Sequence, residues 1–376
     1  MADERILACP IISFDANIWR FFSLVLKHDF MRYLSVIPIA TMTVMMFIDL
    51  YRTSDVREVI INAYFAVLYF NAVLRALTLI YKREKYESFL DKIAIIYEEI
   101  NSTSNEHIKK IVERFTKRAR LISVSNLAVG VFISACYVVY PLFTSQRRLP
   151  YGAHIPGMNL LDSPLYEILF VIQAVLTYPA CCMYIPYASF FASASLFGLV
   201  QIKSLENRLK NFKQHVSGKS LKEKRLQLEA IISDHQRVIH YVSELNGLVT
   251  YICMVELLSF GMMLSAVLFL LIIIDNFAQI VIVISYICMI LEQIFIFYWH
   301  ANEVRVASME IGKAAFSGSW IEFDHASKKK LLMIILRSQR PLQIYIGNAY
   351  PMTLEMFQSL LNACYSYVTL LRRIYK

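Results

Sequence analysis

Apolar stretches of membrane-spanning length recur along this chain of 376 residues, and they constrain its fold more than any other feature. A hydrocarbon core of about 30 Å requires roughly 20 helical residues to cross it. Suitable stretches lie at 33–50, 59–81, 121–144, 165–198, 249–274, 277–299 and 350–371. The 57% share of hydrophobic residues is more than a soluble domain of this size could bury. We therefore predict an all-α membrane protein with seven transmembrane helices.

The basic residues predict how these helices are oriented, because Lys and Arg near the spans are retained on the cytoplasmic side. With the amino terminus inside, the inner segments hold 30 of the 38 Lys and Arg residues and the outer segments hold seven. The chain should therefore have a cytoplasmic amino terminus and an extracellular carboxyl terminus, opposite to G-protein-coupled receptors. The glycosylation sequence Asn101-Ser102-Thr103 then falls inside, so we expect it to carry no glycan.

A few residues within the spans depart from the apolar pattern. Pro38 is expected to interrupt the short first span, and Pro179 and Pro186 to bend the long fourth span. Arg75, deep in the second span, would cost about 2.5–3.5 kcal/mol at the middle of the bilayer unless it is paired or hydrated. Its position near Lys82 predicts that it snorkels toward the inner surface.

The long inner loops contain amphipathic segments. Apolar residues recur at helical spacing between 226 and 249, which predicts a helix that continues into the fifth span. The segments 89–100 and 331–336 repeat the pattern. These helices either pack against one another or form a cytoplasmic platform that docks subunits together. The amount of apolar surface favours the platform.

A polar stripe crosses the otherwise apolar last span. Its members lie along one side of a helix: Glu355, Gln358, Ser359, Asn362, Ser366 and Thr369. Such a stripe is costly against lipid, so it either bonds to other helices of the chain or forms a pore wall shared by several subunits. Leu370 and Leu371 follow the stripe and could close such a pore by dewetting. Gly347 and Pro351 predict a short helix or turn over 341–350.

Motifs in the carboxyl-terminal third resemble those of insect odorant receptors. In chain order they are Trp299-His300-Ala301-Asn302-Glu303, Ala314-Ala315-Phe316 with Ser319-Trp320, Arg337-Ser338-Gln339-Arg340-Pro341, Gly347 with Pro351-Met352-Thr353-Leu354-Glu355-Met356-Phe357, and Tyr365-Ser366-Tyr367. The amino-terminal two thirds resemble the family in layout, with Leu165-Tyr166-Glu167 as a smaller match.

The resemblance implies a tuning subunit of a ligand-gated, non-selective cation channel in the plasma membrane of olfactory sensory neurons. Such receptors have the inverted orientation deduced above and assemble as heterotetramers with a shared co-receptor. The implied partners are a small volatile odorant, the co-receptor, membrane lipid, and permeant monovalent and divalent cations. The polar stripe would then line the pore with Leu370 at its gate, and the inner helices would anchor the subunits.

The resemblance also implies an odorant cavity in the outer half of one subunit, walled by the second, third, fourth and sixth spans. At about 15 Å below the outer end of the second span, and at about the same depth on the third, the candidates are Tyr69, Ala72, Val73, Ser134, Tyr137 and Val138. The fourth span could supply Tyr187, Phe191 and Ala194, and the sixth Ile282 and Ser285. Tyr and Ser in an apolar cavity suit a small, nearly neutral molecule, and the recurring tyrosines favour phenols or indoles. Each of these residues could instead serve ordinary helix packing.

These functions divide the chain into four segments. Residues 1–32 form a cytoplasmic or interfacial segment, and 33–200 hold spans one to four with the ligand cavity. Residues 201–349 hold the anchor helices with spans five and six, and 350–376 hold the pore-lining seventh span and a short extracellular carboxyl terminus.

Rival classes make distinguishable predictions. A gustatory-type receptor of the same superfamily would end in a different motif, and a small-molecule transporter would show two related halves. Catalytic, metal-ligand and phosphate-binding motifs are lacking, so we expect neither enzyme activity nor a cofactor or metal. Cytoplasmic loops facing anionic lipid explain the net charge of +9, so no nucleic-acid partner is expected.

Overall fold

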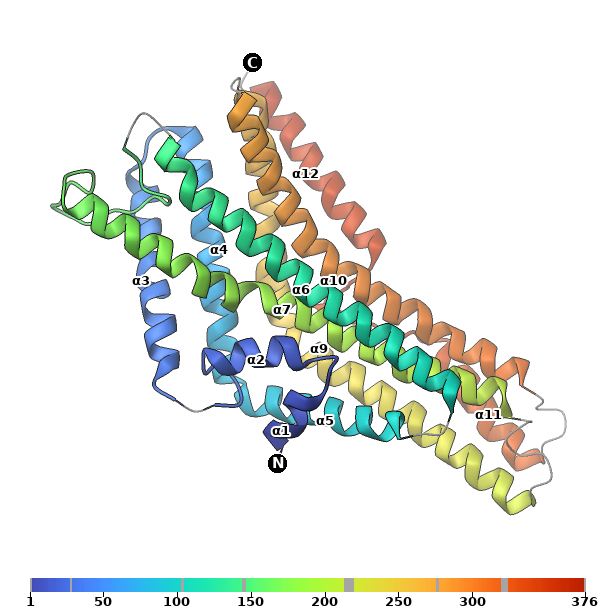
Figure 1. Cartoon of the computed structure of the whole chain (residues 1–376). Coiled ribbons are helices and arrows are strands. Elements are labelled where there is room, and N and C mark those ends of the chain that lie inside the picture. Colours follow the sequence, from blue (N-terminus) through green and yellow to red (C-terminus); the bar gives the residue numbers. More distant parts are fainter. Residues whose placement is uncertain are drawn as a thin grey trace.

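The chain folds into long helices that run side by side (Figure 1). The computed structural model describes residues 2–27, 29–102, 105–143, 147–212, 220–274, 277–318 and 324–374. Thr103, the Ser319-Trp320 pair and the side chain of Leu371 lie outside this description. The elements are α1 (Ala2–Ala8), α2 (Ser13–Phe21), α3 (Met31–Arg52), α4 (Val56–Tyr81), α5 (Arg83–Asn101), α6 (Glu106–Val139) with a 3₁₀ turn (Tyr140–Phe143), α7 (Leu165–Lys210), α9 (Leu221–Ile273), α10 (Phe277–Ser317), α11 (His325–Ser338), β1 (Tyr345–Ile346), β2 (Tyr350–Pro351) and α12 (Leu354–Ile374).

Polar caps fix where several helices begin. The Asp55 side chain accepts a hydrogen bond from the backbone N–H of Arg57 at the start of α4. Asn105 does the same for two N–H groups in the first turn of α6, and Ser220 and Glu223 form a reciprocal capping box at the start of α9. These bonds satisfy N–H groups that have no partner within the helix.

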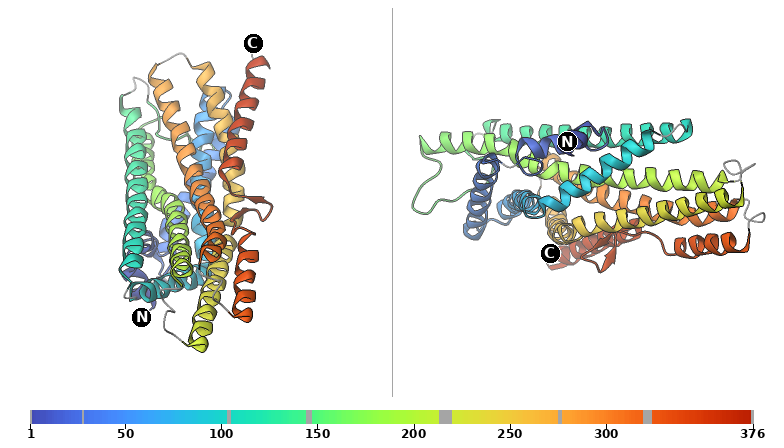
Figure 2. Two further views of the ribbon diagram at one scale, coloured as in Figure 1. Left: turned by 90° about the vertical axis from the view of Figure 1, so that its right-hand side faces the viewer. Right: turned by 90° about the horizontal axis from the view of Figure 1, so that it is seen from below.

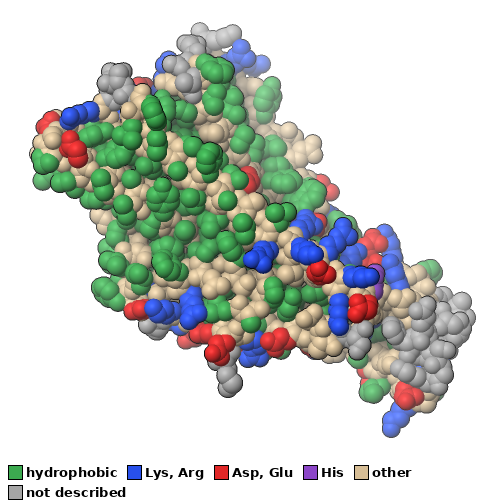
Figure 3. Space-filling model, viewed as in Figure 1, with side chains coloured by type: hydrophobic (Ala, Val, Ile, Leu, Met, Phe, Trp, Pro, Cys, Tyr) green, Lys and Arg blue, Asp and Glu red, His purple; other side chains and the backbone are tan. Residues whose placement is uncertain are grey.

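Six helices of the described residues are long and apolar enough to cross a membrane: α3, α4, α6, α7, α9 and α10. The 21 residues of α12 are also sufficient in length, but its stripe makes it more polar. Apolar side chains cover much of the visible face in Figure 3, whereas charged side chains gather mainly over its lower end. The amino and carboxyl termini lie at opposite ends of the bundle (Figure 2), as an odd number of crossings requires.

Below the apolar region, α5 and α11 pack with the lower ends of α7, α9 and α10 (Figure 1). The predicted helix over 226–249 is confirmed as part of α9, which continues into the fifth span without a break. The segments 89–100 and 331–336 lie in α5 and α11. In α11, Leu331 is buried, but Leu332 and Leu336 remain more than half exposed. The chain therefore leaves part of this amphipathic face uncovered.

One sequence prediction about the spans changes. Pro38 does not interrupt the first span, because α3 is one helix with this proline inside it. Pro179 and Pro186 lie inside the single helix α7, and the bend expected at them stays a prediction. In membrane helices, local adjustments and neighbouring groups satisfy the backbone groups that a proline leaves free.

The segment before α12 is a turn rather than a helix. Strands β1 and β2 pair antiparallel, with Ile346 opposite Tyr350. Gly347 and Asn348 connect them with backbone φ angles of 58° and 59°. Glycine and asparagine tolerate this left-handed region better than other residues. The hairpin packs on α9, where the backbone N–H of Gly347 donates to the carbonyl of Thr250.

The amino-terminal helices are part of the packed core. Trp19 of α2 is fully buried, and its ring centroid lies 4.9 Å from that of Phe190 in α7. Asp15, also buried, accepts a hydrogen bond of 2.9 Å from the hydroxyl of Ser123 in α6. Helix α2 is thereby fixed against α6 and α7.

Candidate functional site

A narrow cavity lies between α4, α6, α7 and α10, toward the end of the bundle where α12 ends. The space open to the centre of a water-sized sphere is about 60 Å³. Its wall is mostly aromatic and aliphatic, which is typical of a site for a small apolar ligand. The lining residues are Tyr64, Phe65, Leu68, Tyr69, Ala72, Ile133, Ser134, Tyr137, Tyr151, Thr177, Ala180, Cys181, Tyr184, Ile185 and Met289.

A larger vestibule of about 700 Å³ adjoins this cavity. Both spaces are lined by Phe65, Tyr137 and Tyr151. The ring centroid of Phe65 lies 5.4 Å from that of Tyr137 and 4.7 Å from that of Tyr151. These three rings therefore form the boundary that a ligand entering from the vestibule has to pass.

Charged and polar groups at the rim of the vestibule pair with one another. Asp49 accepts a hydrogen bond of 2.8 Å from Asn62, and Glu58 lies 3.7 Å from Arg148. Across the described part of the chain, no three His, Cys, Asp or Glu side chains are grouped so that they could hold a metal ion. Both carboxylates named here thus have a nearby donor at the rim.

The hydroxyl groups that line the narrow cavity are mostly paired. Thr177 donates its hydroxyl hydrogen to the Gln173 carbonyl at 2.7 Å, so it accepts from the hydroxyls of Tyr151 at 2.9 Å and Tyr69 at 3.3 Å. Tyr184 also lines the cavity, and its buried hydroxyl has no hydrogen-bond partner among the described residues. The hydroxyl itself is closed to a water-sized sphere, so a ligand reaches it only when side chains of the wall move.

The structure brings together only some of the residues predicted for ligand binding. Those that line the narrow cavity are Tyr69, Ala72, Ser134 and Tyr137. Ile282 lines the vestibule instead, and the hydroxyl of Ser285 lies 2.5 Å from that of Tyr137. Val73 and Val138 line neither space.

The three candidates on the fourth span, Tyr187, Phe191 and Ala194, lie outside the cavity. The Tyr187 hydroxyl lies 2.8 Å from that of Tyr86, and the Phe191 ring packs on Phe297. Tyr187 is 22 residues into α7, which is roughly 33 Å from its start at Leu165. These three residues therefore lie further along α7 than the residues that line the narrow cavity, and their role in ligand binding stays a prediction.

Four cavity-lining residues of α7 were not predicted from the sequence, although their depth along the helix could have identified them. They are spaced at three, one and three residues, which puts them on one helix face: Thr177, Ala180, Cys181 and Tyr184. Tyr151 belongs to the segment between α6 and α7, and no local pattern indicates that it folds back over the cavity.

Arg75 does not snorkel. Its side chain is wholly buried and makes a bidentate ion pair with Glu256 of α9, with Nη2 2.9 Å from Oε2. It also donates to the Tyr184 carbonyl, and its guanidinium carbon lies 4.0 Å from the centroid of the Tyr184 ring. The prediction that Arg75 snorkels was wrong. An ion pair with Glu256, 181 positions away in the sequence, compensates for the cost of burying the arginine charge.

The polar stripe of α12 lies on a face that the described helices leave exposed. Its exposed residues are Glu355, Gln358, Ser359, Asn362, Ser366 and Thr369, followed by Leu370. The stripe hydroxyls donate to carbonyls of α12 itself, at 2.8–2.9 Å, and Glu355 lies 3.8 Å from Arg305 of α10. The opposite face packs on α9, where Cys364 Sγ lies 3.6 Å from the Gly261 carbonyl oxygen. Within the described residues, the stripe hydroxyls thus remain outside interhelical bonding.

Comparisons with known proteins point to a single family. Residues 55–365 match the family described as 7tm odorant receptor. Odorant receptor 10 of Aedes albopictus is 59% identical over 373 residues, which cover 99% of this chain and 100% of that receptor. Odorant receptor Or2 of Anopheles gambiae is 48% identical over 374 residues, covering 98% of each chain. The structure of the insect olfactory receptor OR5 from Machilis hrabei in complex with eugenol superposes with a TM-score of 0.82 at 15% identity, covering 97% of this chain and 99% of that one.

Proposed function

This chain belongs to the insect odorant receptor family, and from that premise we propose that it is the odorant-binding, tuning subunit of a heteromeric, ligand-gated, non-selective cation channel. The family match over 55–365 makes it a multi-pass membrane receptor with seven spans, not an enzyme, and sets aside the gustatory alternative. Its partner is a co-receptor subunit in a heterotetramer. Its location is the plasma membrane of olfactory sensory neurons.

The odorant occupies the narrow cavity, and the observation that carries this proposal is the free hydroxyl of Tyr184 in an aromatic wall. Aromatic rings offer large contact area to a flat apolar molecule, and one hydroxyl adds a directional bond. The favoured ligand is therefore a small aromatic molecule with one polar group, such as a phenol or an indole. The narrow space implies that side chains at the boundary move when it enters.

The stripe of α12 lines the ion pathway, with Glu355, Gln358, Asn362, Ser366 and Thr369 facing water and Leu370 near the gate. The support is geometric, because these side chains form an exposed face on a helix whose other side packs on α9. Monovalent and divalent cations would pass between four such helices, one from each subunit.

The remaining segments serve this channel. Residues 33–200 supply most of the cavity, and residues 201–349 supply the anchor helices and two spans. Residues 350–376 supply the pore helix, and residues 1–32 pack at the inner end of the bundle. The exposed Leu332 and Leu336 of α11 offer an apolar surface for docking a neighbouring subunit. The excess of Lys and Arg supports a cytoplasmic position for this end, facing anionic lipid.

Recording from cells that co-express this chain with the co-receptor tests the proposal. Phenol and toluene have similar size and shape, and only phenol can bond to a hydroxyl. Tyr184→Phe should raise the half-maximal concentration for phenol about fivefold, because it removes one hydrogen bond, and should leave toluene unchanged. Tyr178→Phe, on an exposed position of α7, is the control.

Two other results would contradict the proposal. Equal shifts for phenol and toluene would mean that Tyr184 does not bond to the odorant. Saturable uptake of the compound without an evoked current would support the transporter alternative instead.

A further inference from the structure

A buried ion pair joins three helices directly beneath the odorant cavity. Arg75 of α4 is bound to Glu256 of α9 and to the carbonyl of Tyr184 in α7. Both charged residues are nearly or fully inaccessible to solvent. Leaving one buried charge without its partner would strongly destabilise the protein. Arg75 and Glu256 therefore have to move together when either helix moves.

One end of this linkage is the cavity wall. Tyr184 lines the odorant cavity, and its ring lies against the Arg75 guanidinium, 4.0 Å from ring centroid to guanidinium carbon. Cation–π attraction and the bond to the Tyr184 carbonyl fix the arginine to this one residue from two sides. A ligand that displaces the Tyr184 ring therefore acts on the position of Arg75.

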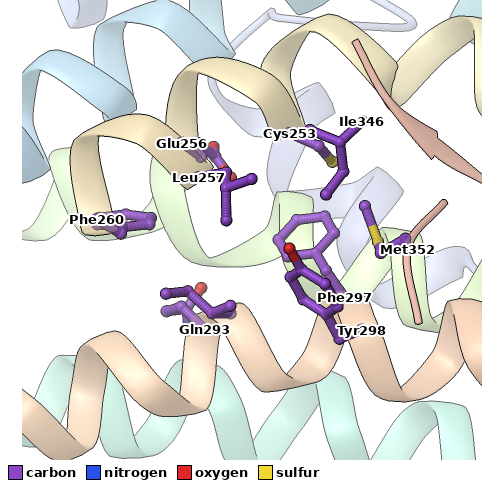
Figure 4. A pocket seen from close by; sticks show the side chains of 10 residues that line it. Cys253, Glu256, Leu257, Phe260, Gln293, Phe297, Tyr298, Ile346 and Met352 are labelled. Carbon is purple, nitrogen blue, oxygen red and sulfur yellow. The ribbon is translucent and has the colours of Figure 1, made fainter. Parts of the chain in front are cut away.

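The other end of the linkage lies beside the base of α12. Glu256 lines a second, small cavity of about 20 Å³ between α9, α10 and the β1–β2 hairpin (Figure 4). Figure 4 shows Met352, two residues before the start of α12, and Tyr298 of α10 facing the same space. The ring centroid of Tyr298 lies 5.6 Å from that of Phe357 in the first turn of α12.

This second cavity is less tightly fixed than its surroundings. The Tyr298 hydroxyl and the Gln293 side-chain oxygen are buried there and have no hydrogen-bond partner among the described residues. Unsatisfied polar atoms and unfilled space lower the cost of rearranging side chains at this point. The base of α12 can thus shift relative to α9 here, more readily than where the helices interlock.

We propose that the Arg75–Glu256 pair is the positioning element that transmits occupancy of the odorant cavity to the base of the pore helix α12. Tyr184 moves with the ligand, Arg75 moves with Tyr184, and Glu256 carries the displacement to the cavity beside Met352 and Phe357. This role rests on the proposed channel function. It concerns how strongly a bound odorant opens the pore, and not how tightly the odorant binds.

Glu256→Gln tests the role, because it keeps the shape of the side chain and removes its charge. The matched control is Glu303→Gln, which makes the same change in a second bidentate pair, where both Arg118–Glu303 distances are 2.9 Å. Phenol and indole serve as probes on cells that express each variant with the co-receptor. Maximal current per receptor at the cell surface should fall about fivefold or more in Glu256→Gln, with phenol binding to the purified receptor unchanged and Glu303→Gln like wild type.

The alternative is that the pair serves only to stabilise the fold. An unchanged maximal current per surface receptor in Glu256→Gln would overturn the proposal, and so would an equal loss in Glu303→Gln. If Glu256→Gln does not reach the surface, Arg75→Lys is measured in the same way, since it keeps the charge and loses the bidentate contact. Failure of both variants to reach the surface, with Glu303→Gln present there, would assign the pair to folding and also overturn the proposal. A wild-type chain without any odorant-evoked current would instead refute the proposed function.

Discussion

Ala72 presents only a methyl group to the odorant cavity, from the same face of α4 as Tyr69. The cavity is narrow, so a larger side chain here would occupy space that the ligand needs. Ala72→Leu should raise the half-maximal odorant concentration about tenfold, which corresponds to roughly 1.4 kcal/mol of binding free energy. The measurement is the concentration dependence of the current for phenol and indole.

Val73 is the matched control, because it is the next residue on α4 and does not line the cavity. Val73→Leu should leave the half-maximal concentration within about twofold of wild type, well below the tenfold step expected of a filled cavity. If Ala72→Leu and Val73→Leu raise the half-maximal concentration equally, a general distortion of α4 would explain the effect better than loss of cavity space.

Asp15 makes the stability of the folded chain depend on pH. Burial raises the pKa of this carboxyl from 3.8 to about 8, although the hydrogen bond from Ser123 partly opposes the rise. Below pH of about 4 the group is neutral in both the folded and the unfolded chain. Between about 4 and 8 it ionises only in the unfolded chain, so the free energy of unfolding falls as pH rises, by up to the order of 5 kcal/mol.

Asp15→Asn should remove this part of the pH dependence. Melting temperatures of the receptor in detergent, at pH 5 and pH 8, give the comparison. Wild type should lose more stability over that interval than Asp15→Asn does. Asp3→Asn, which changes an exposed carboxyl of α1, should behave like wild type. Equal losses in wild type and Asp15→Asn would mean that Asp15 is ionised in the folded chain.

At the scale of elements, the hairpin before α12 is fixed by a glycine. Gly347 has a φ of 58°, and a Cβ at this position would lie 2.6 Å from the sulfur of Met254. Gly347→Ala should therefore destabilise the fold by about 1–2 kcal/mol from backbone strain, with a further cost from the clash. The amount of receptor at the cell surface and its melting temperature should both fall.

Gly157 separates the two causes, because its φ is 81° but open space surrounds the place of its Cβ. Gly157→Ala should cost less than Gly347→Ala, and adding Met254→Ala to Gly347→Ala should recover the part due to the clash. If the two glycine variants are equally destabilised, the clash with Met254 contributes nothing to the cost of Gly347→Ala.

Elements that depend on local composition could be predicted from the sequence, whereas contacts between distant elements could not. The spans follow from apolar runs, and the fusion of an amphipathic segment with the fifth span follows from its 3.6-residue period. The partner of Arg75 is Glu256, and no periodicity connects two residues that far apart. The cavity residues on α4 were found from depth along a helix, but Tyr151 comes from a segment whose course only tertiary packing decides.

At the scale of the whole molecule, orientation in the membrane decides which cavity faces odorant and which surface faces the cytoplasm. The amino and carboxyl ends lie at opposite ends of the bundle, so one measurement fixes the direction of all the spans. The excess of Lys and Arg, 30 against seven, predicts that Asn101 lies inside and the segment around Asn159 outside. Glycan transfer occurs only on the outer side, so it reports orientation directly.

Wild type should therefore show no change in gel mobility when a glycan-cleaving enzyme is added, because Asn101 is never exposed to the glycosylation machinery. Leu161→Ser creates a new acceptor sequence at Asn159, and this variant should gain a mobility shift that the enzyme removes. Leu161→Ala is the control, since it alters the same exposed side chain without creating an acceptor. A glycan on Asn101 would mean that the chain has the opposite orientation in the membrane. The vestibule above Phe65 would then open to the cytoplasm, where no airborne ligand arrives directly.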